Sequence, residues 1–440
     1  MPAGERRNVK SAMAVDQRRR QRQMFERQKQ GRIDRVNLAR MLGQSDQVQA
    51  PNELPPAPEN DEHAAPAHAD CAEGRRLSPH ESGESAQGGF QRARRSVDLE
   101  EDVWAGQVMM PDWMLEAPDD MREKWLVAPR PQGQRCLIVA SAGRTVARLR
   151  TGRLLQVFQS ELPNGAAGRG SARICGQHAT VLDCIFVAEL GCYFICDVLC
   201  WKGHPLVDCT VEFRFFWLQQ KLVEDAPLAA HQHPAQNPHP LHLLPWYCCD
   251  AQGLESAYRS LAVPFTRDGL QFIHRDSHYV VGLTPLMLVW KDCACSTYLS
   301  EVYRDLDPAI QVACLHVTDA GELLTHDTPP LVFARAGAEL AASFARNKKR
   351  LALFKVSGIS LSYPNEGAHN TAHLDGSEVD DSMGVPQVAV ANIEFYAPAA
   401  ARRVDADSLT KILFQQRLRV QPLSYEELQR HTALPLALSG

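Results

Sequence analysis

The chain has 440 residues, a formal net charge of −5 and 45% hydrophobic residues, so it can bury a sizeable core in two or three folding units. No apolar run approaches the roughly 18 residues of a membrane helix, and the charged N-terminus lacks the apolar stretch of a secretory signal. The 13 cysteines are therefore expected to be free thiols in a reducing, intracellular protein. Cys248-Cys249 and Cys293/Cys295 have no second pair at zinc-finger spacing, so neither a metal site nor a cofactor is expected.

The N-terminal segment is strongly basic. Residues 1–43 hold 12 lysines and arginines against four acids, a net charge of +8 within an acidic chain. Residues 16–42 lack proline and predict a helix between Asp16 and Gly43. Its apolar positions are sparse, so we expect an arm that is disordered when unbound and folds on an acidic partner. Residues 44–102, rich in Pro, Ala, Gly and acids, predict a disordered linker.

From residue 103 the pattern becomes globular. Asp268-Gly269 predicts a turn between two short strands, and 253–262 predicts a helix. Many strands with few helices favour an α+β fold built on antiparallel sheets over 103–300. Strands are predicted, from β-branched and aromatic runs, over 135–143, 180–187, 192–201 and 207–218.

The last part, 301–440, is a C-terminal extension with a weaker pattern. It either completes the preceding sheet or is an addition that binds something else. Residues 363–386 are an acidic insertion. Strands are predicted over 311–317 and 387–397, and helices over 407–419 and 424–431, the second with a Ser424/Glu427 capping box.

Five sequence segments, in the order in which they occur along the chain, are distinctive. They are PDWMLEAPDDM, GQRCLIVASAGRT, TVLDCIF, CDVLCWKGHPLVDCTVEFRFFW and DGLQFIHRDSHYVVGLTPLMLVW. Behind a basic arm and an acidic linker, they resemble the snurportin family, the import adaptors of spliceosomal small nuclear RNPs, over roughly 16–43 and 104–291. The resemblance implies a non-enzymatic protein, in both cytoplasm and nucleus. It also implies a cap-binding domain similar in fold to the mRNA-guanylyltransferase and DNA-ligase catalytic core.

The resemblance implies a pocket for the 2,2,7-trimethylguanosine cap. Methylation at N7 makes the purine cationic, so an aromatic face is needed, and the phosphates need basic residues. Trp290 would stack on the base, although core packing is the alternative for Trp290 and for Trp113. Pro111 stands where serine is expected, and Arg130 where a small residue is usual. The implied cap-binding residues are Met110, Pro111, Trp113, Arg130, Arg135, Arg150 and Trp290.

The resemblance also implies that the arm binds importin-β through guanidinium–carboxylate pairs. A solvated tail and a nonspecific RNA-binding arm are the alternatives. Gly31 departs from the family, which often has lysine there. An export receptor is a further implied partner, for which residues 1–15 offer few apolar side chains. The residues implied to bind importin-β are Arg18, Arg19, Arg20, Arg22, Arg27, Lys29, Arg32, Arg35 and Arg40.

Two other classes of function remain open from the residues alone. A nucleotidyltransferase needs a Lys-x-Asp-Gly nucleophile, and neither Asp-Gly pair, at 268–269 or 375–376, has the lysine. A metal-dependent cap hydrolase could use Asp183, Asp197 and Asp208, but apolar neighbours favour a structural use of these acids. The other alternative is a general capped-RNA or single-stranded RNA-binding protein without a transport role.

Overall fold

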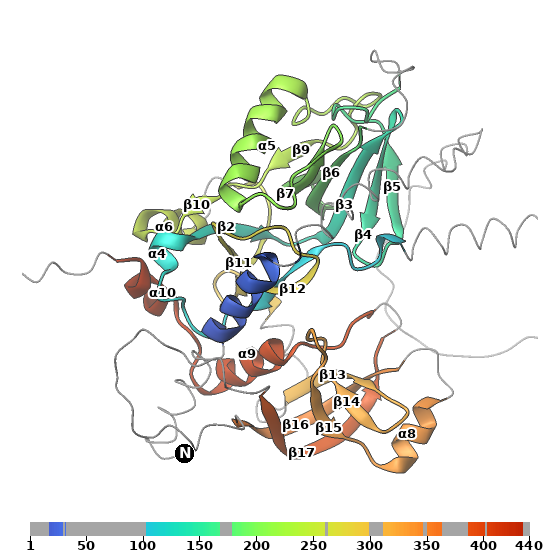
Figure 1. Ribbon diagram of the computed structural model, residues 1–440, viewed down its shortest axis with the longest axis vertical. Helices are drawn as coiled ribbons and strands as arrows, with labels where there is room; N and C mark the ends of the chain where they lie inside the picture. Colours follow the sequence, from blue (N-terminus) through green and yellow to red (C-terminus); the bar gives the residue numbers. More distant parts are fainter. Residues whose placement is uncertain are drawn as a thin grey trace, which may run out of the picture.

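The computed structural model divides the strands of the chain among three sheets, which follow one another down the long axis of the molecule (Figure 1). We call them the upper sheet, the central sheet and the C-terminal barrel. The α+β class with mainly antiparallel sheets is confirmed. No helix of the described residues is long and apolar enough to cross a membrane. The structure describes residues 17–29, 31, 103–167, 178–259, 263–298, 311–345, 350–362, 386–400 and 403–433.

Three predicted features lie outside these residues. They are the linker over 44–102, almost all of the acidic insertion over 363–386, and the arm beyond Gly31, with Arg32, Arg35 and Arg40.

The upper sheet has the order β5-β4-β3-β6-β7-β8, with β9 parallel to β7. Its two middle strands, β6 and β7, are buried along their whole length because apolar clusters cover both faces of the sheet. They match the predicted strands closely. The strands are β3 (Gln134–Ser141), β4 (Arg144–Leu149), β5 (Leu154–Phe158), β6 (Thr180–Val187), β7 (Cys192–Trp201), β8 (His204–Pro205) and β9 (Leu241–Leu243).

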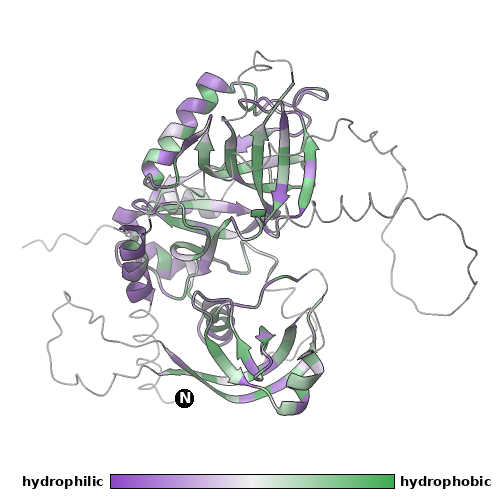
Figure 2. Cartoon of the chain, turned by 45° about the vertical axis from the view of Figure 1, so that its right-hand side comes forward, coloured by the Kyte–Doolittle hydropathy of each residue, from purple (hydrophilic) through white to green (hydrophobic). Residues whose placement is uncertain are grey.

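The strand predicted over 207–218 is wrong, because this segment forms helix α5 (Val211–Asp225). The Thr210 side chain caps the helix by accepting a hydrogen bond from the Phe213 amide. The buried positions recur every three or four residues, which is the period of a helix face and not of a strand. Figure 2 shows hydrophilic and hydrophobic residues interspersed along this helix, beside the largely hydrophobic strands of the upper sheet. The buried residues are Val211, Arg214, Leu218 and Leu222.

The central sheet has the order β1-β12-β11-β2-β10. Asp268-Gly269 does not form the predicted turn, since both residues lie inside strand β11. Gly269 has a φ of +94°, and a Cβ there would lie 2.5 Å from the Trp290 carbonyl oxygen, so the pair marks an irregular bulge in the strand. The elements are β1 (Met109–Trp113), β2 (Trp125–Pro131), β10 (Tyr247–Cys248), β11 (Arg267–His274), β12 (Gly282–Trp290), α4 (Met121–Lys124) and α6 (Ala251–Arg259).

The C-terminal strands form a sheet of their own, in the order β15-β14-β13-β16-β17. Among the described strands, these five pair only with one another, so they do not complete the preceding sheet. The elements are β13 (Gln311–Val317), β14 (Glu322–Leu324), β15 (Val332–Arg335), α8 (Ala338–Ala345), β16 (Leu351–Ser362), β17 (Gln387–Pro398), α9 (Leu409–Val420) and α10 (Tyr425–Thr432).

Helix α9 joins this barrel to the central sheet (Figure 1). One apolar cluster includes Trp290 of the central sheet, Phe354 of the barrel and Ile412 of α9. The barrel and the central sheet therefore share a continuous core, and the C-terminal third is an integral part of the fold.

Candidate functional site

An aromatic cluster surrounds Trp113, the half-buried last residue of β1. The centroid of the Trp113 ring lies 4.8 Å from that of Phe414 and 5.4 Å from that of Tyr298. The Lys291 ammonium nitrogen lies 5.7 Å from the Trp113 centroid and 4.7 Å from the Tyr298 centroid. Both distances are within cation–π range. The cluster thus already holds a cation against two aromatic rings.

Two cations beside this cluster share one carboxylate. Lys291 Nζ lies 2.5 Å from one Asp268 oxygen, and Arg130 forms an ion pair with the other. Burial, together with the charge of Arg130, lowers the pKa of Lys291 to about 8, although Asp268 opposes this shift. Burial would raise the pKa of Asp268, but the two cations outweigh it and the pKa is lowered. With Lys291 protonated, this trio carries a net charge of +1.

A second trio comes from the C-terminal region. Arg403 and Lys411 both form ion pairs with Asp407, the lysine at 2.6 Å. In the same region, the Thr410 hydroxyl of α9 donates to Asp112, the residue before Trp113. Helix α9 and the segment before it therefore bring cations and an aromatic ring to the cluster. Two trios of net positive charge next to aromatic rings suit a ligand with a flat base and phosphates.

Arg135 was expected to face phosphates, but it lies in a buried network. Its Nε and Nη2 atoms donate to Asp183 at 2.5 and 2.8 Å. The Tyr279 hydroxyl donates to the same carboxylate at 2.7 Å and accepts from the Met109 amide at 3.0 Å. The Tyr279 hydroxyl thus connects the Arg135–Asp183 pair of the upper sheet to the start of β1. In this arrangement the guanidinium is not presented to a ligand.

Trp290 was expected to stack on the cap base, and the structure places it in the core instead. Its side chain is 0% exposed, and its indole nitrogen donates to the Leu423 carbonyl oxygen at 2.9 Å. A neighbouring ring, that of Tyr258, lies 6.1 Å away. Core packing, the alternative that the sequence left open for Trp290, is what the structure shows.

The remaining residues expected at the cap lie on or near β1. Met110 and Pro111 are half-buried and pair with Leu283 and Thr284 of β12. Arg150 follows β4 and lies 2.7 Å from Asp405, with its side chain 39% exposed. Of the implied set, Trp113 and Arg130 are linked through Lys291 and Asp268, whereas Arg135 and Trp290 belong to other parts of the fold.

The arm residues that the structure describes form a helix over 17–29, which lies against the body. Arg20 forms an ion pair with Asp112, and Arg18 lies 3.0 Å from Asp119. The Phe25 ring packs edge-on against His274 at 4.9 Å. The predicted helix is therefore present over 17–29, where the body offers it acids and an aromatic surface, whereas the disorder of the unbound arm stays a prediction.

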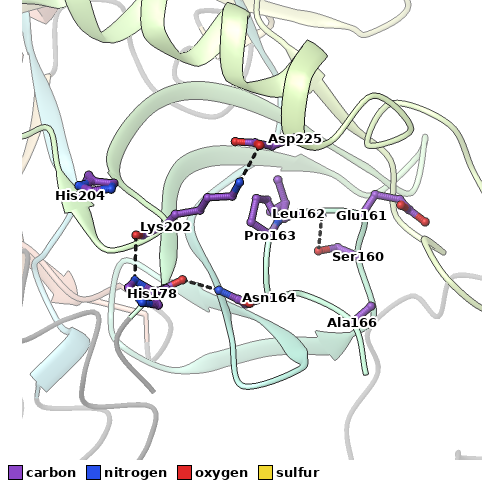
Figure 3. A pocket seen from close by; sticks show the side chains of 10 residues that line it. All are labelled: Ser160, Glu161, Leu162, Pro163, Asn164, Ala166, His178, Lys202, His204 and Asp225. Atoms are coloured by element: carbon purple, nitrogen blue, oxygen red, sulfur yellow. Dashed lines mark hydrogen bonds and ion pairs between the residues drawn. The ribbon is translucent and has the colours of Figure 1, made fainter. Parts of the chain in front are cut away.

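Figure 3 shows a cavity of about 500 Å³, and none of the residues that line it belongs to the Trp113 cluster. It adjoins the start of β4, where the Ser160 and Thr145 hydroxyls are 2.6 Å apart, whereas Arg150 follows the end of that strand. The two ends are about 17 Å apart. Within the cavity, Lys202 is paired with Asp225 at 2.6 Å. The cavity is therefore separate from the residues expected to bind a cap.

Sequence reasoning missed several members of the cluster. Lys291 directly follows Trp290, so a cation beside a tryptophan was a signal that could have been used. Phe414, Lys411 and Asp405 gave no signal, because packing across the whole chain brings them to their partners. Phe414 packs on Trp113, the charge of Lys411 acts on Lys291, and Asp405 pairs with Arg150.

Comparison with known protein families gives a match to one part of the chain, residues 107–292. The family model described as "Snurportin1, m3G cap-binding domain" matches residues 107–292. Among solved structures, the ligase domain of M. tuberculosis LigD is 15% identical with a TM-score of 0.30, over 58% of this chain and 90% of that chain. The Chlorella virus DNA ligase-adenylate is 11% identical with a TM-score of 0.29, over 57% and 94%. These two structural similarities are too weak to indicate a function.

Proposed function

Residues 107–292 belong to the snurportin cap-binding domain family, and from this premise we propose that the chain binds the 2,2,7-trimethylguanosine cap of spliceosomal small nuclear RNAs. The family match is the observation that carries this proposal. The Trp113 cluster supports it, because a cationic purine is attracted to an indole face and the bridging phosphates to cations.

Trp113 takes the stacking role that the resemblance gave to Trp290. Its ring is half-buried, whereas the Trp290 ring is fully enclosed. The ammonium of Lys291 lies 5.7 Å from the centre of the Trp113 ring, so a cationic base that stacks there would displace it from the ring face. Arg130, which already shares Asp268 with Lys291, would contact the phosphates.

The protein would act as a nuclear import adaptor that carries capped RNA and binds importin-β through the arm, shuttling between cytoplasm and nucleus. An export receptor would return it. Arg18 and Arg20 are held by Asp119 and Asp112, so their use by another protein requires the helix over 17–29 to leave the body. The exposed Arg18–Asp119 pair is individually weak, whereas Asp112 is buried, so separating Arg20 from Asp112 is the larger cost of this release.

The proposed activity is binding without catalysis. Two of the three carboxylates considered for a metal-dependent hydrolase are engaged by strong donors, Asp183 by Arg135 and Tyr279, and Asp197 by Arg214. The third, Asp208, lies 4.0 Å from His278. The strand that would carry a nucleotidyl-transfer nucleophile has no lysine. Incubation with GTP and magnesium should therefore give no covalent adduct, and a capped oligonucleotide should remain intact.

The decisive experiment is competition between trimethylguanosine and monomethylguanosine caps. The wild-type protein should prefer the trimethylated cap, and Trp113→Ala should weaken binding about tenfold or more, since stacking contributes roughly 1–3 kcal/mol per base. Phe216→Ala is a matched control, because Phe216 is a 61% exposed aromatic residue on α5. Equal affinity for the two caps would reject the specificity, and full binding by Trp113→Ala would reject the site.

The adaptor role has a separate test. Deletion of residues 1–43 should abolish importin-β binding and leave cap affinity intact. If the deletion instead lowers affinity for capped RNA tenfold while importin-β binding persists, the arm is an RNA contact and the general RNA-binding alternative is favoured.

A further inference from the structure

The C-terminal strands have the connectivity of an oligonucleotide-binding barrel. Strand β13 pairs with β14 and β16, β14 pairs with β15, and β16 pairs with β17. Strand β17 also lies against β15, which nearly closes the sheet, and helix α8 connects the third strand to the fourth. Partly open five-stranded Greek-key barrels of this kind, the OB-folds, bind oligonucleotides and oligosaccharides. Connectivity alone does not assign a ligand, so the surface must be considered.

The chain itself covers one outer face of the barrel. The Asp407 amide donates to the Cys314 carbonyl oxygen at 2.7 Å, and the Cys314 amide donates to the Asp407 carboxylate at 2.8 Å. Ala399 and Ala406 pack in the same cluster as Cys314. The outer side of β13 is therefore occupied by the chain itself, whereas β17 is exposed at most of its positions.

That surface presents an exposed aromatic ring beside a cation. Tyr396 is 47% exposed, and the Lys355 ammonium nitrogen lies 5.1 Å from the centre of its ring. The pairing register shifts at this point of β17, so that Tyr396 is the extra residue of a bulge, a feature that re-aims a side chain. Next along the same face, the Asn392 amide donates to the Ser357 hydroxyl. A ring, an ammonium and neutral hydrogen-bonding groups in a row suit stacked bases of a single strand.

We infer that this face of the barrel binds the single-stranded RNA that continues from the cap, with Tyr396 as a base-stacking residue. The inference rests on the proposed function, because the cap sets where that RNA begins. Tyr396 is 11 residues before Asp407, whose charge acts on Tyr298 in the cluster around Trp113. Even a fully extended chain would keep Tyr396 and Asp407 within about 40 Å of each other. Nucleotides that leave a cap at Trp113 can therefore run onto the barrel of the same molecule.

The charges predict the character of this binding. Lys355 pairs in register with Glu394, so the face carries little net positive charge. Neutralisation of RNA phosphates will then contribute little to the binding affinity, and base stacking will contribute most of it. We expect the added affinity from the RNA to change with salt with a slope of about 1 or less on a double-logarithmic plot.

The test compares three probes on the full-length chain. They are a trimethylguanosine cap dinucleotide, a capped oligonucleotide of about 12 nucleotides, which is within the site size of one OB-fold, and the same oligonucleotide without a cap. The capped oligonucleotide should bind about tenfold more tightly than the dinucleotide. Tyr396→Ala should remove this gain, and Tyr396→Phe should keep it. Phe216→Ala controls for the loss of an exposed aromatic residue elsewhere.

The outcomes separate this inference from the proposed function. If the capped oligonucleotide and the dinucleotide bind equally, or if Tyr396→Ala keeps the gain, the barrel does not bind RNA through this face and the inference fails, while cap binding stands. If the dinucleotide does not bind but the uncapped oligonucleotide does, in a manner that depends on Tyr396, the inference holds and the proposed cap specificity fails.

Discussion

Arg214 and Lys291 are both buried cations with an aspartate partner, one on the helix covering the upper sheet and the other at the rim of the central sheet. Arg214 is 0% exposed and donates to both oxygens of Asp197 and to two backbone carbonyls, those of Cys209 and Ser277. Lys291 shares its aspartate, Asp268, with Arg130 and lies against aromatic rings.

The comparison distinguishes a buried charge that stabilises the fold, that of Arg214, from a charge that is available to bind a ligand, that of Lys291. Beside the upper sheet, the Asp197 carboxylate neutralises the single Arg214 guanidinium, and backbone carbonyls accept hydrogen bonds from the third nitrogen of that guanidinium. At the central rim one carboxylate serves two cations, so positive charge is in excess. A site that binds phosphates needs such an excess, whereas a core does not tolerate it. The following variants test this distinction, from the largest expected effect to the smallest.

Breaking the upper-sheet pair should have the largest effect. Asp197→Ala leaves the Arg214 guanidinium buried without its carboxylate, which should lower the free energy of unfolding by about 3–5 kcal/mol. Chemical denaturation measures this loss. The double variant Asp197→Ala/Arg214→Met should recover much of it, because no buried charge then remains. A loss below about 1 kcal/mol in the single variant would contradict a purely structural role.

The sequence predicted the upper sheet well where burial is continuous. Strands β6 and β7 of this sheet, and β13 of the barrel, agree with their predicted ranges to within a residue, because each is a run rich in β-branched and apolar residues. The segment containing α5 failed because its aromatic residues favour a strand. Its helical period includes Arg214, a residue that becomes a core position only when Asp197 lies opposite.

The candidate site could be predicted only in part. Trp113 and Arg130 followed from the family resemblance, and both lie in or beside the aromatic cluster. Trp290 could not be placed, since its burial depends on Leu423, 133 residues later in the chain. Phe414 packs on Trp113 from a helix still further away in sequence. Contacts of this range arise from tertiary packing, which local patterns do not encode.

The two tryptophans provide the next test of the distinction. Trp290→Ala should cost about 3–5 kcal/mol of stability, because it opens a large cavity in the shared core. Trp113→Ala should cost less than half as much, since the ring is only half-buried, yet it should weaken cap binding more. Thermal or chemical unfolding and cap titration of both variants give the comparison. Equal stability losses would contradict the assignment of Trp290 to the core and Trp113 to the site.

Lys291 should give a pH dependence that Arg214 cannot. Its pKa is lowered from 10.5 to about 8 in the folded state, so the unfolded chain binds more protons above pH 8, and stability contributed by this group rises with pH. Relative to Lys291→Met, the wild-type protein should gain about 1.4 kcal/mol in the free energy of unfolding between pH 7 and 9.

The difference between wild type and variant is the quantity to follow, because buried thiols such as Cys196, with its pKa raised to about 11 by burial, titrate over a similar range in both proteins. If the difference in unfolding free energy between wild type and Lys291→Met does not change from pH 7 to 9, the Lys291 ammonium is not desolvated. The contrast with Arg214 would then lose its basis.

The smallest expected effect concerns Arg150, whose partner Asp405 occupies the guanidinium that was expected to meet a phosphate. Both side chains are partly exposed, so their attraction amounts to less than about 1 kcal/mol. Asp405→Asn should therefore raise affinity for the capped RNA by only about two- to fivefold, and the gain should vanish in 0.5 M salt. Arg150→Ala should lower affinity and remove any benefit of Asp405→Asn in the double variant. If Asp405→Asn still improves binding when Arg150 is absent, the aspartate acts by general repulsion of RNA, and Arg150 belongs with the structural arginines of the upper sheet.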